Sequence, residues 1–113
     1  MTNTPASTVS IVLTTLGADA DAAAIARTLI DERLAACVNI LPPMTSVYRW
    51  QGKVEQDREQ QMVIKTTSGR VADLQARLRQ LHPYELPEFL VLDATGSEAY
   101  LAWVGESARP AST

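Results

Sequence analysis

Reactive and metal-binding side chains are scarce in this sequence. Its 113 residues include one cysteine and one histidine, which excludes an intrachain disulfide and gives a single copy few strong metal ligands. No apolar run approaches the ~18 residues that cross a bilayer. Basic residues number 10 against 13 acidic ones, and the net charge of −3 disfavours a general nucleic-acid binder. We therefore expect a cytoplasmic protein with no membrane or nucleic-acid partner.

The composition is that of one globular domain. Hydrophobic residues make up 46% and charged residues 20%, a balance that supports a core at this length. We expect a single domain over residues 1–113, with an ordered core at about 8–107. The small polar segments 1–7 and 108–113 are predicted to be tails.

Changes in hydrophobic periodicity divide the chain into strands and helices. They predict strands at 9–14, 34–41, 45–50, 62–66 and 89–94, and helices at 22–29, 71–81 and 98–104. Asp19 or Asp21 is expected to cap the first helix, Ser68 the second and Ser97 the third. Gln51-Gly52 predicts a tight hairpin turn. The polar arm that follows, 54–61, fits either a helix or a solvated strand.

An internal repeat indicates how these elements are arranged. Residues 11–17 resemble residues 63–69, and each copy is followed by a helical pattern and an apolar strand. Two tandem βαβ halves give the βαββαβ order of a ferredoxin-like α+β sandwich, an antiparallel sheet with both helices on one face. The hairpin between 45 and 61 extends this fold, and the third helix is an addition.

Two helices cover one side of such a sheet, and the other side is not polar. Depending on the register of strand pairing, it is expected to carry residues from the set Val38, Ile40, Val47, Tyr48 and Trp50. Monomers rarely expose an apolar patch of this kind, and aromatic residues on protruding elements, here also Trp103, are typical of subunit interfaces. The pattern predicts a homo-oligomer. The alternative is a small aromatic core beneath the third helix.

Cys37 is the one thiol, in a predicted strand. It is either an inert packed side chain or, as a thiolate, a ligand for a soft metal. With His82 it could also form a nucleophile–base pair, although any chain with one residue of each type would qualify. The sequence has no phosphate-binding, zinc-protease or nucleophile-elbow motif.

The densest polar stretch is the loop His82–Glu88, which two prolines stiffen. Imidazole and carboxylate groups there could bind a divalent cation, or His82 could simply cap the preceding helix. The acidic residues Glu55, Asp57 and Glu59 are interpreted as a solvated charge run.

Several motifs in register resemble the CutA family of divalent-cation tolerance proteins. They are Leu34–Ile40 (LAACVNI), Ser46–Lys53 (SVYRWQGK), Ile64–Thr66 (IKT), His82–Glu88 (HPYELPE), and Tyr100, Leu101 and Trp103. The resemblance runs from about Val9 to Glu106. It implies a homotrimer similar in assembly to PII signalling proteins, with long hairpins from each chain meeting around the threefold axis.

The resemblance also implies a link to copper and other divalent metals. It places Cys37 in a copper site and His82, Tyr84 and Glu88 near a cleft between subunits. The function we expect is non-enzymatic, weak or transient metal binding by a trimer, through Cys37, His82 and Glu88. The alternative is a PII-like regulator that binds a small ligand in a cleft formed by Glu59, Lys65 and Tyr84. Tyr48, Trp50 and Trp103 are the expected trimer contacts.

Overall fold

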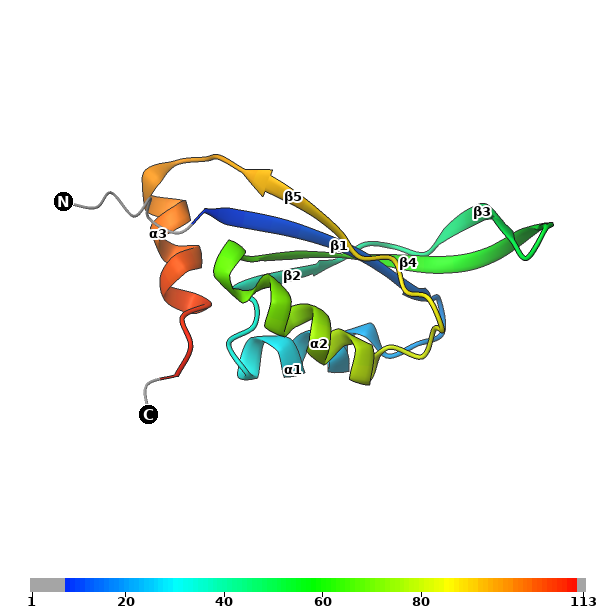
Figure 1. Cartoon of the computed structure of the whole chain (residues 1–113), viewed down its shortest axis with the longest axis horizontal. Helices are drawn as coiled ribbons and strands as arrows, with labels where there is room; N and C mark the ends of the chain where they lie inside the picture. The colour runs from blue at the N-terminus through cyan, green and yellow to red at the C-terminus, as the bar shows by residue number, and fades with distance from the viewer. Residues whose placement is uncertain (1–7, 112–113) are drawn as a thin grey trace.

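Residues 8–111 are described by a computed structural model and form one sheet with helices packed on it (Figure 1). In chain order the elements are β1 (Val9–Gly17), α1 (Ala22–Asp31), β2 (Cys37–Ile40), β3 (Met44–Trp50), β4 (Lys53–Thr67), the 3-10 turn η1 (Ser68–Arg70), α2 (Val71–Leu81), β5 (Leu90–Ala94) and α3 (Glu98–Ser107). This order confirms the ferredoxin-like α+β fold. The tail predicted at 1–7 lies outside the described residues. Within 8–111 no helix is long and apolar enough to cross a membrane.

The sheet is built around the long strand β4. One edge of β4 pairs antiparallel with β1, from Val9 opposite Thr67 to Gly17 opposite Glu59. The other edge of β4 pairs with β3 over its first half and with β2 over its second half. The segment 42–43, two prolines, separates β2 from β3 because proline has no N–H to donate to the ladder. β5 pairs with the free edge of β1.

β3 and the outer part of β4 project from the body as a hairpin (Figure 1). Its turn has positive φ at Gln51 (50°) and Gly52 (81°), as two-residue hairpin turns require. The molecule measures 54 × 26 × 23 Å, and its radius of gyration of 15.3 Å exceeds the ~13 Å of a compact chain of this length. Because it pairs with β3 and β1 within β4, the arm 54–61 is a strand, one of the two alternatives that the sequence left open.

The main core lies between the sheet and the helices α1 and α2. Val12, Met62 and Ile64 from the sheet meet Leu29 of α1 and Leu74 of α2, and all five side chains are fully buried. Each contributes about 1.5–3 kcal/mol through burial. Alternate residues of a strand face opposite sides, so even-numbered positions of β4 face the helices and odd-numbered ones face away.

α3 packs against one end of the sheet, on the face that α1 and α2 leave open. Val104 and Ala108 are fully buried there, together with Val9 of β1. The Nζ of Lys65, an odd-numbered residue of β4, lies 6.0 Å from the centre of the Tyr100 ring. Ala108 was assigned to the predicted tail at 108–113, but its side chain belongs to this packing.

Two of the predicted helix caps are confirmed and one is wrong. Asp21 accepts a hydrogen bond at the start of α1, and Ser97 does so at the start of α3. Ser68 does not cap α2, because the short η1 turn intervenes. Its hydroxyl instead contacts the hydroxyl of Ser10 at 2.8 Å and donates to the Thr8 carbonyl at 3.0 Å. These bonds tie the end of β4 to the start of β1.

Candidate functional site

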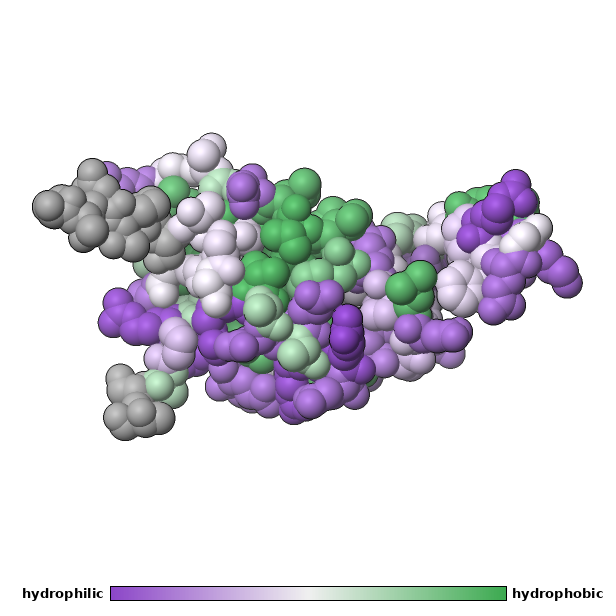
Figure 2. Space-filling view, viewed as in Figure 1, coloured by the Kyte–Doolittle hydropathy of each residue, from purple (hydrophilic) through white to green (hydrophobic). Residues whose placement is uncertain are grey.

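The sheet face opposite α1 and α2 is partly covered by α3 and otherwise exposes apolar side chains. Leu90 and Leu92 of β5 are 55% and 52% exposed, and Trp103 of α3 is 47% exposed. Figure 2 shows apolar residues gathered over the middle of the molecule, beside β5. Two residues named for this patch lie on the other face of the sheet. Val38 packs against the helical core because it pairs with the core-facing Ile64, and Ile40 pairs with the core-facing Met62.

The predicted aromatic contacts remain open to solvent within one chain. Tyr48 and Trp50 of the hairpin are 40% and 38% exposed, in addition to Trp103. Trp103 stacks on Tyr100 with ring centres 5.5 Å apart. The alternative of an aromatic core beneath α3 is therefore wrong, since the residues buried there are aliphatic.

Cys37 lies at the first position of β2, directly opposite Lys65 of β4. Both residues occupy the face of the sheet away from α1 and α2. The thiol is half-buried, and its Sγ is 3.9 Å from the side-chain oxygen of Asn39. Cys37 is therefore not sealed in the core.

His82 ends α2 and is buried, with both ring nitrogens engaged. Nε2 lies 2.6 Å from the carbonyl oxygen of Thr15, and the backbone N–H of Tyr84 donates to Nδ1 at 3.1 Å. Because Nδ1 accepts, the proton is on Nε2, which donates to Thr15. The imidazole thus attaches the loop 82–89 to β1. No ring nitrogen is left to bind a metal unless one of these bonds breaks.

The residues expected to bind metal do not come together within one chain. Glu88 accepts a hydrogen bond from Gln61 at 3.2 Å, at the same level of the sheet as Thr15 and His82. Cys37 is opposite Lys65, which lies four residues beyond Gln61 along β4. Four strand residues span ~13 Å, so Cys37 is about that far from the level of Glu88. Across residues 8–111 no group of three histidine, cysteine or acidic side chains is arranged to hold a metal ion.

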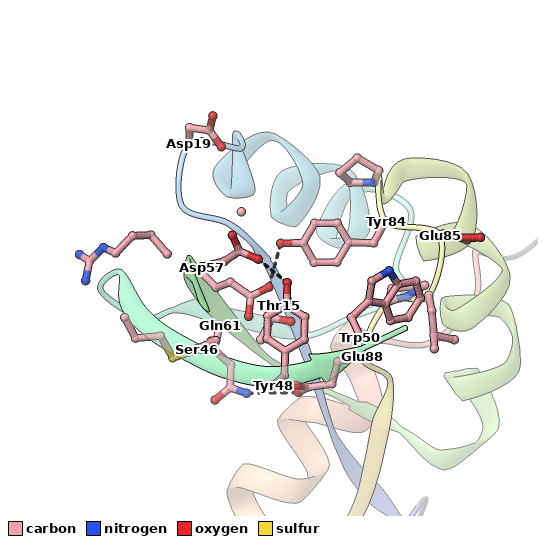
Figure 3. A pocket seen from close by; sticks show the side chains of 17 residues that line it. Thr15, Asp19, Ser46, Tyr48, Trp50, Asp57, Gln61, Tyr84, Glu85 and Glu88 are labelled. Carbon is pink, nitrogen blue, oxygen red and sulfur yellow. Dashed lines mark hydrogen bonds between the residues drawn. The ribbon is translucent and has the colours of Figure 1, made fainter. Parts of the chain in front are cut away.

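A cavity of about 1030 Å³ lies between the β3–β4 hairpin and the loop 83–88 (Figure 3). Glu59 and Tyr84, two of the residues expected in a ligand cleft, line it. Lys65 does not, because β4 carries it to the far end of the sheet beneath Tyr100. Two residues predicted as trimer contacts, Tyr48 and Trp50, form part of the wall.

Two tyrosine–carboxylate pairs meet inside this cavity. The Tyr84 hydroxyl donates to Glu59 at 2.8 Å, and the Tyr48 hydroxyl donates to Asp57. In Figure 3 the two hydroxyl groups converge on the same part of the cavity, Tyr48 from the hairpin and Tyr84 from the loop. Glu59 is buried, with 7% of its surface exposed. The arrangement is a pair of neutral donors that hold two neighbouring carboxylates in place.

Both tyrosines are held in the protonated form. The hydrogen bond to Asp57, with the negative charge around it, raises the pKa of Tyr48 to about 12. Burial, followed by the hydrogen bond to Glu59, raises the pKa of Tyr84 well above its usual value. At neutral pH both phenols therefore remain hydrogen-bond donors and add no charge to the cavity.

Sequence reasoning included Glu59 in a possible site but missed its neighbours Asp57 and Gln61. Asp57 was interpreted as a solvated charge, and Gln61 was not singled out at all. Their spacing held a signal, since Glu55, Asp57, Glu59 and Gln61 alternate and share one face of a strand. It was not usable while the arm 54–61 could also be a helix, which would have spread them around its surface.

The fold and the cavity define a ferredoxin-like protein whose chain carries a long projecting hairpin. A family model described as "CutA1 divalent ion tolerance protein" matches residues 10–107. A divalent-cation tolerance protein CutA of Thermus thermophilus is 46% identical over 98 residues, covering 86% of this chain and 95% of that protein. Protein CutA of Homo sapiens is 48% identical over 81 residues, which cover 71% of this chain and 45% of the human protein.

Solved structures give the same result. CutA1 of Thermus thermophilus superposes with a TM-score of 0.84 at 45% identity, covering 88% of this chain and 97% of that one. CutA1 of Oryza sativa superposes with a TM-score of 0.85 at 36% identity, covering 92% and 97%. The chain therefore belongs to the CutA1 family of divalent ion tolerance proteins, as its motifs indicated.

Proposed function

We propose that this protein is a non-enzymatic, cytoplasmic divalent-metal-binding protein that works as a homotrimer, with copper as its metal. The observation that carries the proposal is the uncovered face of the sheet. That face combines exposed apolar side chains, such as Leu92, with the half-buried thiol of Cys37. Membership of a divalent ion tolerance family supports the metal role.

A trimer would supply more metal ligands than one chain does. One chain supplies one thiol and no cluster of three metal-binding side chains within residues 8–111. An assembly that buries the open face brings several copies of Cys37 toward common interfaces. Thiolate sulfur is a favoured ligand of copper(I), so Cys37 fits that metal. The net charge of −3 per chain is multiplied in the assembly and attracts cations.

The other two expected ligands fit less well. His82 uses both ring nitrogens in hydrogen bonds, so its contribution is to fix the loop. Glu88 keeps one carboxylate oxygen bonded to Gln61 and lies beside the cavity rather than beside Cys37. We therefore assign the metal to Cys37 and its copies, with weak or transient affinity because few ligands surround each ion.

The assembly is tested by light scattering after size-exclusion chromatography. We expect a mass about three times the 12.3 kDa of one chain. Leu92→Glu, on the open face, should yield monomers, whereas Ile30→Glu, on the exposed side of α1, should not. A wild-type monomer at micromolar concentration would contradict the trimer.

The metal site is tested by calorimetric titration with copper(I) under reducing conditions and with zinc(II). Cys37→Ser should abolish copper binding without changing the mass of the assembly. His82→Gln should retain it. Equal copper affinity of the wild type and Cys37→Ser would remove the thiol from the site.

A second candidate function is that of a PII-like regulator that binds a small ligand. The cavity of about 1030 Å³ beside the hairpin favours it, because a space of this size exceeds what a metal ion occupies. Such a protein would capture a partner only when the ligand is present, and would do so in the presence of a metal chelator.

A further inference from the structure

The walls of the hairpin cavity are strongly acidic. Five carboxylates line it against one guanidinium: Asp19, Asp57, Glu59, Glu85 and Glu88, with Arg58. Arg58 is the one basic side chain of the lining, and one of its N–H groups already donates to Thr45, as Gln61 donates to Glu88. A phosphate or carboxylate ligand would meet repulsion here and find few donors.

The carboxylates are also held so that a ligand can use them. Tyr84 donates to one oxygen of Glu59, and among the described residues no other hydrogen bond reaches that carboxylate. Its second oxygen is left for a donor from the cavity. Because the Tyr48 and Tyr84 hydroxyls stay protonated, both side chains are neutral and leave the negative charge of these carboxylates unchanged.

Aromatic rings form a further part of the wall. Tyr48 and Trp50 approach from the hairpin and Tyr84 from the loop, as Figure 3 shows. The Tyr84 ring is fixed at both ends, by its hydroxyl bond and by His82, whose ring centre is 4.8 Å away. The faces of aromatic rings attract an alkylammonium cation, and carboxylates beside the rings balance its charge.

We propose that this cavity binds an organic cation, an amine or quaternary ammonium compound, between the Asp57 and Glu59 carboxylates and the rings of Tyr48, Trp50 and Tyr84. A bare metal ion is less suitable, because no three metal-binding side chains are arranged to coordinate one within residues 8–111. The inference rests on the small-ligand function proposed above for the same cavity and names the ligand class.

The test is calorimetric titration of the assembled protein with choline and spermidine at constant ionic strength. The matched neutral ligand is 3,3-dimethylbutanol, which has the shape of choline without its charge. Both cations should bind, and 3,3-dimethylbutanol should bind at least about tenfold more weakly. Comparable binding of choline and its neutral analogue would overturn the inference, because charge would then play no part.

Charge-removing variants locate the site. Asp57→Asn and Glu59→Gln should each weaken choline binding about tenfold while unfolding at nearly the wild-type temperature. Asp31→Asn removes the same charge from the exposed end of α1, outside the cavity, and should leave binding unchanged. Equal losses in all three variants would show non-specific attraction and contradict the site.

Titration with ATP separates this inference from the function on which it rests. Binding of ATP without binding of either cation would overturn the organic-cation assignment and leave the small-ligand function standing. If neither ATP nor the cations bind, both fail. Binding of the cations alone supports both.

Discussion

Replacing His82 distinguishes a structural histidine from a metal ligand. In His82→Ala the carbonyl oxygen of Thr15 and the N–H of Tyr84 each lose their hydrogen-bond partner. Leaving a buried polar group unsatisfied costs about 1–3 kcal/mol, so the two losses together cost about 3 kcal/mol, before any effect of the space left by the ring. We expect the free energy of unfolding to fall by this amount.

The change is large enough to measure by thermal unfolding followed by circular dichroism. At roughly 2.1 cal/mol/K of unfolding entropy per residue, about 3 kcal/mol lowers the midpoint of a chain of this length by roughly 13 °C. Protomer concentration must be held fixed, since assembly adds concentration-dependent stability. His82→Gln is the matched control, because its amide nitrogen can donate to Thr15 in place of Nε2, and it should recover part of the loss.

Metal titration of the same variants completes the experiment. If His82 only positions the loop, His82→Gln binds copper like the wild type. The reasoning is refuted if His82→Ala unfolds at the wild-type temperature, or if His82→Gln is stable but no longer binds metal.

Three further predictions concern the turn, the helix pair and the cavity. Gly52→Ala should destabilise the fold by about 1 kcal/mol in urea unfolding, because its φ of 81° is unfavourable for a residue with a Cβ although no atom would clash. In a double-mutant cycle Arg77→Ala and Glu32→Ala should show a coupling of at most about 1 kcal/mol, because this two-pronged ion pair between α2 and α1 is partly exposed. Stability should be retained up to about pH 10 and decline toward pH 12, since Tyr48 has a raised pKa and its neutral form is favoured by folding; in Tyr48→Phe this alkaline decline, followed by circular dichroism, should be smaller.

Local chemistry made much of the fold predictable. The proline pair at 42–43, the turn at 51–52 and the helix-ending His82 each restrict the backbone on their own, and each acts where expected. The cap at Ser68 failed because a hydroxyl at a strand end can bond to a neighbouring strand as readily as to a helix. That choice depends on tertiary structure, which no local pattern contains.

The candidate site was less predictable than the fold. Glu59 and Tyr84 were identified, but their hydrogen bond joins positions 25 residues apart and depends on how the loop returns past β1. Lys65 lies away from this cavity within one chain, because its position follows from the register of a 15-residue strand. Once the arm 54–61 is known to be extended, the alternating acidic residues of the hairpin fall on one face.

The pairing of β4 with three different strands has a consequence for how the chain folds. β3 returns to β4 across a two-residue turn, whereas each pairing of β1 with β4 joins residues 42 to 58 positions apart. Closing such long loops lowers chain entropy before any contact compensates, and domains dominated by distant pairings fold slowly. The hairpin can close within microseconds, so its strand β4 is available as a template before β1 arrives. The segment that projects furthest from the finished domain is thus the one best placed to form first.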